Sequence, residues 1–348
     1  MKLKLLCTFL LTIVLNINNN PKTIQPDVYV AGRIDSGENS IAVLWKNGTP
    51  QYLTDANNQA DANSVYVTDK DIYVGGRINK TAVLWKNGIP QYLTDGNYNA
   101  TIWSVYVSDN DVYALGNEYN DKKQLIATIW KNGIPQRLTN SYSSFAWSIF
   151  VSDNDVYVVG HKHSIGSRKL QKGVATLWTN GIAQNLTSGY YTSDAHSVFV
   201  SGNDVYVVGY EYDENYKPIA KLWKNGIDEN LTDENNITSF AYSVFASDKD
   251  VYVAGNGYEK YETKEYEDED DNKSIAFLWK NGELQHLTDK NVDVSASSVF
   301  VLRNDVYIAG TQYYKNDVEF TAMLWKNGKP QRLIDGDKNA VANSVFVK

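Results

Sequence analysis

One pattern recurs seven times along this chain of 348 residues. A complete copy reads Ser-Val-Phe-Val, then Asp-Val-Tyr-Val-x-Gly, then Ala-x-Leu-Trp-Lys-Asn-Gly, and finally Gln-x-Leu-Thr, with small substitutions. The copies are marked by the tryptophans Trp45, Trp85, Trp130, Trp178, Trp223, Trp279 and Trp325. Repeats that step by 40 to 55 residues and contain four strand-like runs each are typical of β-propeller blades.

Each copy predicts four strands, which we name A to D in chain order. Residues 104–107 and 111–113 alternate β-branched and aromatic side chains, as expected for strands A and B. Residues 82–85 are a strand C, and residues 91–94 are the following strand D. Between C and D stands Asn-Gly, the strongest short-range signal for a hairpin because both residues tolerate positive φ.

The two ends of the chain predict how the ring closes. The first copy begins at strand B with Asp27, whereas residues 344–347 form a strand A with nothing after it. Together these fragments complete one blade, which removes two exposed sheet edges. We therefore predict an all-β fold: a seven-bladed β-propeller of four-stranded antiparallel blades over residues 27–348, with the first blade closed by the C-terminal strand.

Residues 1–20 have the composition of a probable signal peptide, and residues 21–26 form a short linker. Lys2 and Lys4 supply a positive start, and residues 5–15 form an apolar core too short to span a bilayer comfortably. We expect a secreted, periplasmic or cell-surface protein, with no transmembrane segment in the mature chain. The single cysteine, Cys7, lies in this leader, so the propeller has no thiol for a disulfide.

The acidic balance of the chain argues against one class of partner. The net charge of -8 and the pI of about 5.1 do not suit a nucleic-acid-binding protein, which needs a basic surface to contact phosphates. We expect no cofactor and a monomer that binds a glycan or a peptide.

The repeat resembles that of bacterial secreted seven-bladed β-propeller repeat proteins, which are similar in architecture to WD40, NHL and YVTN propellers. The resemblance covers residues 27–348 and rests on the Asp-Val-Tyr-Val-x-Gly and Leu-Trp-Lys-Asn-Gly runs. The Gly-His and Trp-Asp pairing of WD40 repeats is missing, as are the Gly-Gly signature of kelch repeats and the Ser-x-Asp-x-Gly-x-Thr-Trp box of sialidases. The resemblance thus implies an architecture, and no catalytic residue is carried over.

Length variation among the copies is concentrated in one loop. The step from the strand B glycine to the strand C tryptophan is 9 residues for Gly76, 18 for Gly160 and 24 for Gly255. This B-C loop emerges on the same face of a propeller as the D-A connection. We expect function on that B-C/D-A face, because binding residues usually lie on loops held by a rigid scaffold. The alternative is simple tolerance of surface loops to insertion.

Residue identity varies most just before the strand A serine, where the innermost strand begins. Four consecutive copies have a ring there, and two others have an amide: Trp103, Trp147, His196, Tyr242, Asn63 and Asn343. Flat apolar area beside a few polar groups suits a sugar ring or an extended peptide, so we predict that these residues bind the ligand. The alternative is that the rings pack between blades and plug the channel.

Two weaker hypotheses concern chemistry. Asp61 and Asp194 occupy equivalent positions three residues before the strand A serine and could act as the acid and base of a glycosidase or lyase. His161 and His163 lie on one side of a strand and could bind a metal, although no third ligand is evident. The acidic run 259–271 could bind calcium, but it lacks the alternation and the glycine of such loops. The preferred hypothesis is a non-enzymatic binding propeller; the others are an enzyme and a purely structural surface protein.

Overall fold

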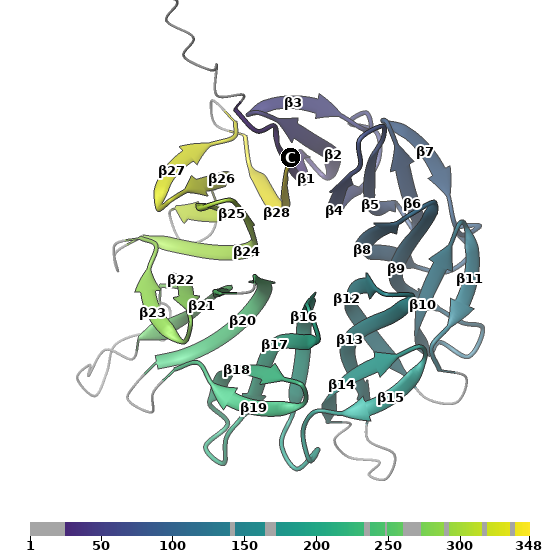
Figure 1. Ribbon diagram of the computed structural model, residues 1–348. Helices are drawn as coiled ribbons and strands as arrows, with labels where there is room; N and C mark the ends of the chain where they lie inside the picture. The colour runs from purple at the N-terminus through teal and green to yellow at the C-terminus, as the bar shows by residue number, and fades with distance from the viewer. Residues whose placement is uncertain are drawn as a thin grey trace, which may run out of the picture.

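The structure, a computed structural model, describes residues 25–139, 143–163, 172–232, 237–247, 249–259, 273–288, 292–314, 319–334 and 338–348. In these residues seven four-stranded antiparallel sheets form a ring, which confirms the predicted seven-bladed all-β propeller (Figure 1). The probable signal peptide, residues 21–24 of the linker and residues 260–271 of the acidic run lie outside the described residues.

Each blade consists of four strands that follow one another outward from the centre of the ring. The innermost strands A are β28 (Ala340–Val347), β4 (Ala60–Val67), β8 (Ala100–Ser108), β12 (Ser144–Ser152), β16 (Ser193–Ser201), β20 (Ile237–Ala246) and β24 (Asp293–Leu302). Strands B are β1 (Val28–Ser36), β5 (Ile72–Ile78), β9 (Asp111–Tyr119), β13 (Asp155–His163), β17 (Asp204–Tyr212), β21 (Val251–Glu259) and β25 (Asp305–Tyr314). Strands C are β2 (Asn39–Lys46), β6 (Thr81–Lys86), β10 (Leu125–Lys131), β14 (Gly173–Thr179), β18 (Pro218–Lys224), β22 (Ile275–Lys280) and β26 (Glu319–Lys326). The outer strands D are β3 (Thr49–Tyr52), β7 (Ile89–Tyr92), β11 (Ile134–Arg137), β15 (Ile182–Asn185), β19 (Ile227–Asn230), β23 (Glu283–His286) and β27 (Lys329–Arg332).

The first blade closes with the C-terminal strand, as predicted. Strand β28 pairs with β1 in the sheet β28-β1-β2-β3. Beyond the pairing, Asp27 and Lys348 exchange two backbone hydrogen bonds of 2.7 and 2.9 Å. The strands A are longer than the predicted four-residue runs: β28 begins at Ala340, not at residue 344. The extra residues continue the pairing beyond an irregularity in the strand, described below.

The C-D hairpins are built by the Asn-Gly pairs that the sequence predicts. In the fifth blade, Asn225 and Gly226 have φ values of 52° and 82°. The Asn225 side chain accepts a 2.8 Å bond from the Val205 N–H and donates a 2.8 Å bond to Asp204. The same two bonds recur in all seven blades, so the strand B aspartates and the turn asparagines build the turns.

The core lies between the blades. Seven hydrophobic clusters each combine side chains of two neighbouring blades, and each contains one of the repeated tryptophans. Trp223 of β18, for example, packs with Val159 and Leu177 of the preceding blade. All seven strand C tryptophans are at most 1% exposed and pack between blades. The described part of the chain contains no helix with the length and apolar composition needed to cross a bilayer.

Candidate ligand-binding site

A β-bulge interrupts strand A at one residue in every blade. In the fifth blade, Ala195 pairs with Gly209 and Ser197 pairs with Val208, so His196 has no partner on strand B. The bulged residues around the ring are Asn63, Trp103, Trp147, His196, Tyr242, Ser297 and Asn343. A bulge re-aims one side chain without changing the rest of the sheet. The position that varies most in sequence is therefore the position whose side chain is released from the pairing.

The repeated glycine of strand B is required at this bulge. A Cβ on Gly209 would lie 2.0 Å from the carbonyl oxygen of Asp194, because the bulged strand A passes close to strand B there. Equivalent contacts of 1.9 to 2.0 Å face the matching glycine in every other blade. A side chain at this position would push the two strands apart.

The serine after the bulge links each blade to the next. The Ser197 hydroxyl oxygen accepts a bond from the backbone N–H of Val244 at 3.2 Å. Seven such bonds of 3.0 to 3.3 Å run round the ring without a gap, from Ser64, Ser104, Ser148, Ser197, Ser243, Ser298 and Ser344. Because each serine oxygen serves as the acceptor in this bond, each hydroxyl keeps its own hydrogen to donate to a further acceptor.

Two residues beyond each serine, an aromatic side chain completes a second ring. Its members are Tyr66, Tyr106, Phe150, Phe199, Phe245, Phe300 and Phe346, with neighbouring centroids 4.7 to 5.2 Å apart. Since each side chain touches both neighbours, this aromatic ring surrounds the channel on the A-B side of the serines.

A cavity of about 510 Å³ lies on the B-C/D-A side of the aromatic ring. It is lined by the bulged residue and the serine of every blade. Asn256, Ser295 and Tyr313 complete its wall. Asn256 and Tyr313 lie toward the B-C ends of their strands, so the cavity belongs to the B-C/D-A face. All six residues that the sequence predicts as ligand contacts meet here, and the volume is in the range of small-molecule sites.

One half of the cavity wall is aromatic. Trp103 meets the edge of Trp147 at a centroid distance of 5.0 Å, Trp147 stacks on His196 at 4.9 Å, and Tyr242 follows at 5.1 Å. All four rings are partly buried. They therefore pack against one another across the blades and line the cavity at the same time, so the two sequence interpretations are compatible.

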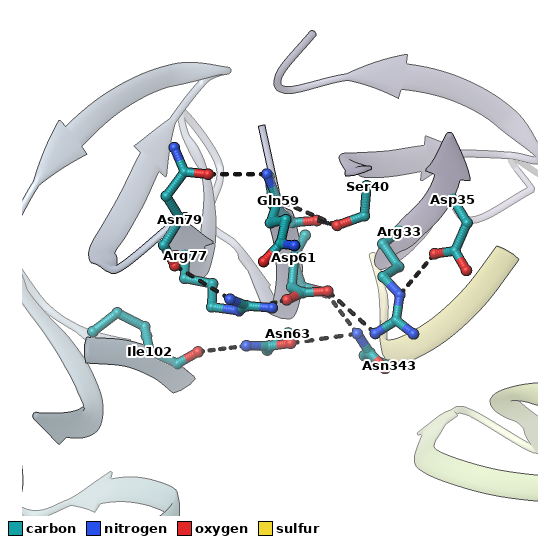
Figure 2. Close-up of polar contacts among 12 residues, drawn as sticks. Arg33, Asp35, Ser40, Gln59, Asp61, Asn63, Arg77, Asn79, Ile102 and Asn343 are labelled. Carbon is teal, nitrogen blue, oxygen red and sulfur yellow. Dashed lines mark hydrogen bonds and ion pairs between the residues drawn. The ribbon is translucent and has the colours of Figure 1, made fainter. Parts of the chain in front are cut away.

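The other half of the wall is polar. Asn343 donates a 3.0 Å hydrogen bond to the carbonyl oxygen of Ala62, and Asn63 donates a 2.9 Å bond to that of Ile102 (Figure 2). Asn343 also approaches the Asn63 side-chain oxygen at 3.4 Å. The amide nitrogens thus bind the neighbouring blade, which orients both side chains at the cavity wall.

Asp61, one of the two carboxylates considered for catalysis, is held by two arginines. Its oxygens lie 3.2 Å from Nη1 of Arg33 and 2.6 Å from Nε of Arg77, and Arg33 also pairs with Asp35 at 3.1 Å (Figure 2). Asp61 is buried, whereas both arginines are about one-third exposed. Two arginines and two aspartates therefore form one group of balanced charge beside the asparagines.

Asp194, the second carboxylate, lies behind the aromatic half three blades away. It accepts a 2.9 Å bond from the indole N–H of Trp147, lies 3.0 Å from Nδ1 of His161, and is 3.7 Å from Nε2 of His196. Burial acts to raise the pKa of Asp194, but the two imidazoles and the indole N–H outweigh it and hold the pKa below its ordinary value. Burial lowers the pKa of His196 despite the neighbouring carboxylate. Asp194 therefore positions the indole of Trp147 and lies close to His196.

The two aspartates follow one rule that sequence reasoning missed. Each contacts the residue after the strand B glycine of the preceding blade, Arg33 for Asp61 and His161 for Asp194. The signal was present, because both preceding copies have a basic residue at that position. His163 adjoins His161 at a ring distance of 5.4 Å, but no group of three or more His, Cys, Asp or Glu that could hold a metal ion occurs among the described residues.

No protein-family model matches the sequence, and a comparison with curated proteins gives no match either. Solved structures do match. The β-propeller domain of the Trilobed protease from Pyrococcus furiosus is 13% identical, with a TM-score of 0.53 over 88% of this chain and 94% of that one. An uncomplexed acylaminoacyl peptidase from Pyrococcus horikoshii is 12% identical, with a TM-score of 0.54 over 88% of this chain and 50% of that one. A putative TolB from Agrobacterium tumefaciens is 10% identical, with a TM-score of 0.47 over 91% and 98% of the two chains.

At this level of identity the two Pyrococcus matches show the propeller fold alone. One difference within the fold is informative: the Pyrococcus furiosus domain is described as having an open velcro topology, whereas here β28 pairs with β1 and closes the ring. The chain is a seven-bladed, closed β-propeller whose repeats lack the diagnostic motifs of the better-known propeller families.

Proposed function

We propose that the protein is a non-enzymatic propeller that binds a glycan or a peptide in the cavity on its B-C/D-A face. The observation that carries this proposal is the cavity itself. Six residues whose identity departs from the repeat all line one cavity of about 510 Å³. Its wall combines flat aromatic side chains with orienting polar groups, which is the composition of small-molecule sites in general.

The state of the two carboxylates favours binding over hydrolysis. Asp61 is paired with two arginines, and Asp194 is surrounded by N–H donors. A general acid in a glycosidase needs a raised pKa, whereas the surroundings of Asp194 lower its pKa. Asp61 and Asp194 also belong to strands β4 and β16, which lie in separate parts of the ring (Figure 1).

The test is a screen of the protein on glycan and peptide arrays, followed by titration of any ligand found. A variant combining Trp103→Ala, Trp147→Ala and Tyr242→Ala should lose at least about tenfold in affinity, because it removes three of the four rings of the aromatic half of the wall. The matched control replaces three exposed aromatics outside the cavity, Tyr52, Tyr92 and Tyr216, by alanine.

Stoichiometry and catalysis separate the remaining hypotheses. One ligand per protein supports the central cavity, whereas seven would indicate one weak site per blade. Turnover of a polysaccharide that disappears in Asp61→Asn or Asp194→Asn would contradict the proposal and favour the enzyme. Equal binding by the triple variant and its control would show that the cavity is not the site.

We propose further that the protein is exported, on the composition of residues 1–20. Mass spectrometry of the protein recovered from its native cells should then find a chain that lacks this leader. Recovery of the intact N-terminus from the cytoplasm would overturn the proposal without affecting the binding site.

A further inference from the structure

The lining of the central cavity is polar but carries no fixed charge. Of the 17 described residues that line it, nine are serines, three are asparagines, and the remainder are Trp103, Trp147, His196, Tyr242 and Tyr313. None of these is Asp, Glu, Lys or Arg. Burial keeps His196 in its neutral form by lowering its pKa, and burial raises the pKa of Tyr242, so the phenol is neutral as well. The described wall is therefore uncharged near neutral pH.

Two carboxylates beside this wall are engaged by other side chains and are not part of the lining. Asp61 pairs with Arg33 and Arg77 next to the asparagines, and Asp194 lies behind Trp147, whose indole it holds. A charged group of a ligand would therefore meet no partner of opposite sign among the described residues that line the cavity, and an unpaired charge removed from water is strongly unfavourable.

The wall offers both kinds of hydrogen-bonding group. The serine ring leaves hydroxyl hydrogens to donate, because each serine oxygen accepts a backbone N–H. The amides of Asn63 and Asn343 donate to backbone carbonyls, so their oxygens remain able to accept. Hydroxyl groups of a sugar both donate and accept, and the apolar faces of sugar rings suit indole side chains.

The shape of the channel favours a ligand chain that enters with one of its ends first. The seven side chains of the aromatic ring surround the channel on the A-B side of the serines, so a ligand that enters from the B-C/D-A face passes the serines before it reaches them. A peptide that enters end first presents an ammonium or a carboxylate, whereas the end of a neutral glycan presents only hydroxyls.

We infer that the cavity takes the terminal residues of an uncharged glycan, and that it discriminates against uronic acids and peptide ends. This inference rests on the proposed function, because it specifies the ligand class of the same cavity. Trp103 and Trp147 provide the stacking surface, and the serine ring with the two asparagines provides the hydrogen bonds.

The experiment measures affinity, by calorimetry or tryptophan fluorescence, for probes that include one pair matched except for charge. The probes are neutral disaccharides (α-1,4-galactobiose, cellobiose, mannobiose and N,N′-diacetylchitobiose), digalacturonic acid as the acid counterpart of galactobiose, and a hexapeptide library with free ends. Neutral sugars should bind at least about tenfold more tightly than the acid counterpart or any peptide. Ser297→Lys, which adds a cation at the bulge of the seventh blade, should shift the ratio toward digalacturonic acid by about tenfold.

Each outcome decides the inference. Equal or tighter binding of digalacturonic acid, or binding of peptides alone, would overturn it while the proposed binding function stands. An affinity ratio between digalacturonic acid and galactobiose that stays the same in Ser297→Lys would also overturn it. Absence of binding by every sugar and peptide would overturn both the inference and the proposed function.

Discussion

The two faces of the propeller differ in how they use the repeat. On the A-B/C-D face, the hydrogen bonds between the turn asparagine and the strand B aspartate recur in all seven blades at 2.7 to 2.8 Å. On the B-C/D-A face, the bulged residue is an indole in two blades, an amide in two, and an imidazole, a phenol or a hydroxyl in the others. One face is regular, and the other is different in almost every blade.

This difference shows that the bulge separates fold from function. Because the bulged side chain takes no part in strand pairing, its identity is free to change without affecting the core. The residues on either side of it, alanine or isoleucine before and serine after, are nearly constant. The propeller thus presents one variable side chain per blade on an invariant frame, and the predictions below test whether the two roles are separable.

The largest effect on stability is expected from replacing a repeated strand C tryptophan by alanine. Trp223→Ala should lower the free energy of unfolding by about 3–5 kcal/mol, because the side chain is fully buried between two blades. Trp103→Ala, which removes a partly buried bulged tryptophan, should cost less than half as much. Urea denaturation of both variants measures the difference. Similar losses would mean that the bulged tryptophans are part of the core.

The serine ring should give the second largest effect. Ser197→Ala leaves the Val244 N–H without its acceptor, and an unsatisfied buried donor costs about 1–3 kcal/mol. Ser297→Ala is the matched control, because it removes a cavity hydroxyl that lies outside the serine ring. Urea denaturation should show a clear loss for the first variant and little for the second. The opposite order would mean that the serines serve the cavity rather than the frame.

Acid should lower the free energy of unfolding through titratable groups on the B-C/D-A face. The folded state lowers the pKa of His196 by burial, so the unfolded chain takes up a proton first, below about pH 6.5, and stability falls as the pH decreases. Asp194, whose pKa is also lowered, acts in the same direction below about pH 3.9. His196 faces Asp194, His161, Trp147, Tyr210 and Tyr242.

His196→Phe isolates this contribution. The variant keeps an aromatic ring but has no proton to bind, so its stability should fall less than that of the parent protein between pH 7 and pH 5. Thermal denaturation over this range provides the measurement, with His286→Phe as a control on strand β23, away from the cavity. Identical pH profiles for the parent protein and His196→Phe would show that His196 takes up protons equally in the folded and unfolded states.

The sequence predicts the frame almost completely, since each feature of the frame is written seven times. The seven blades, the closing strand and the buried tryptophans follow from the repeat. The bulge also left a signal that could have been recognised. In the second blade, Ala60 and Ala62 share a core face with Val65 and Val67, so the alternation slips by one residue at Asn63.

The contacts between the residues that differ from the repeat could not be predicted in the same way. Trp147, His161 and Asp194 were assigned to three separate hypotheses, yet they meet in one cluster because neighbouring blades bring their strand ends together. The distance between blades depends on packing, which local periodicity does not encode. Only the pairing rule between an aspartate and a basic residue one copy earlier, seen in Asp61 with Arg33, carries such information in the sequence.

The smallest effect on stability should come from replacing a lysine of the repeated Lys–Asp ion pairs. Lys224 pairs with Asp204 at 2.7 Å and lies over the ring of Tyr206, but both charged side chains are at least one-third exposed. Exposed ion pairs contribute little and are screened by salt. Lys224→Thr should therefore change the midpoint of urea denaturation only slightly, and the change should vanish at high salt. The fourth blade supports this expectation, because it already has Thr179 at the equivalent position and its hairpin forms the same asparagine bonds. A loss as large as that of Ser197→Ala would instead mean that these ion pairs, rather than the turns alone, hold the regular face together.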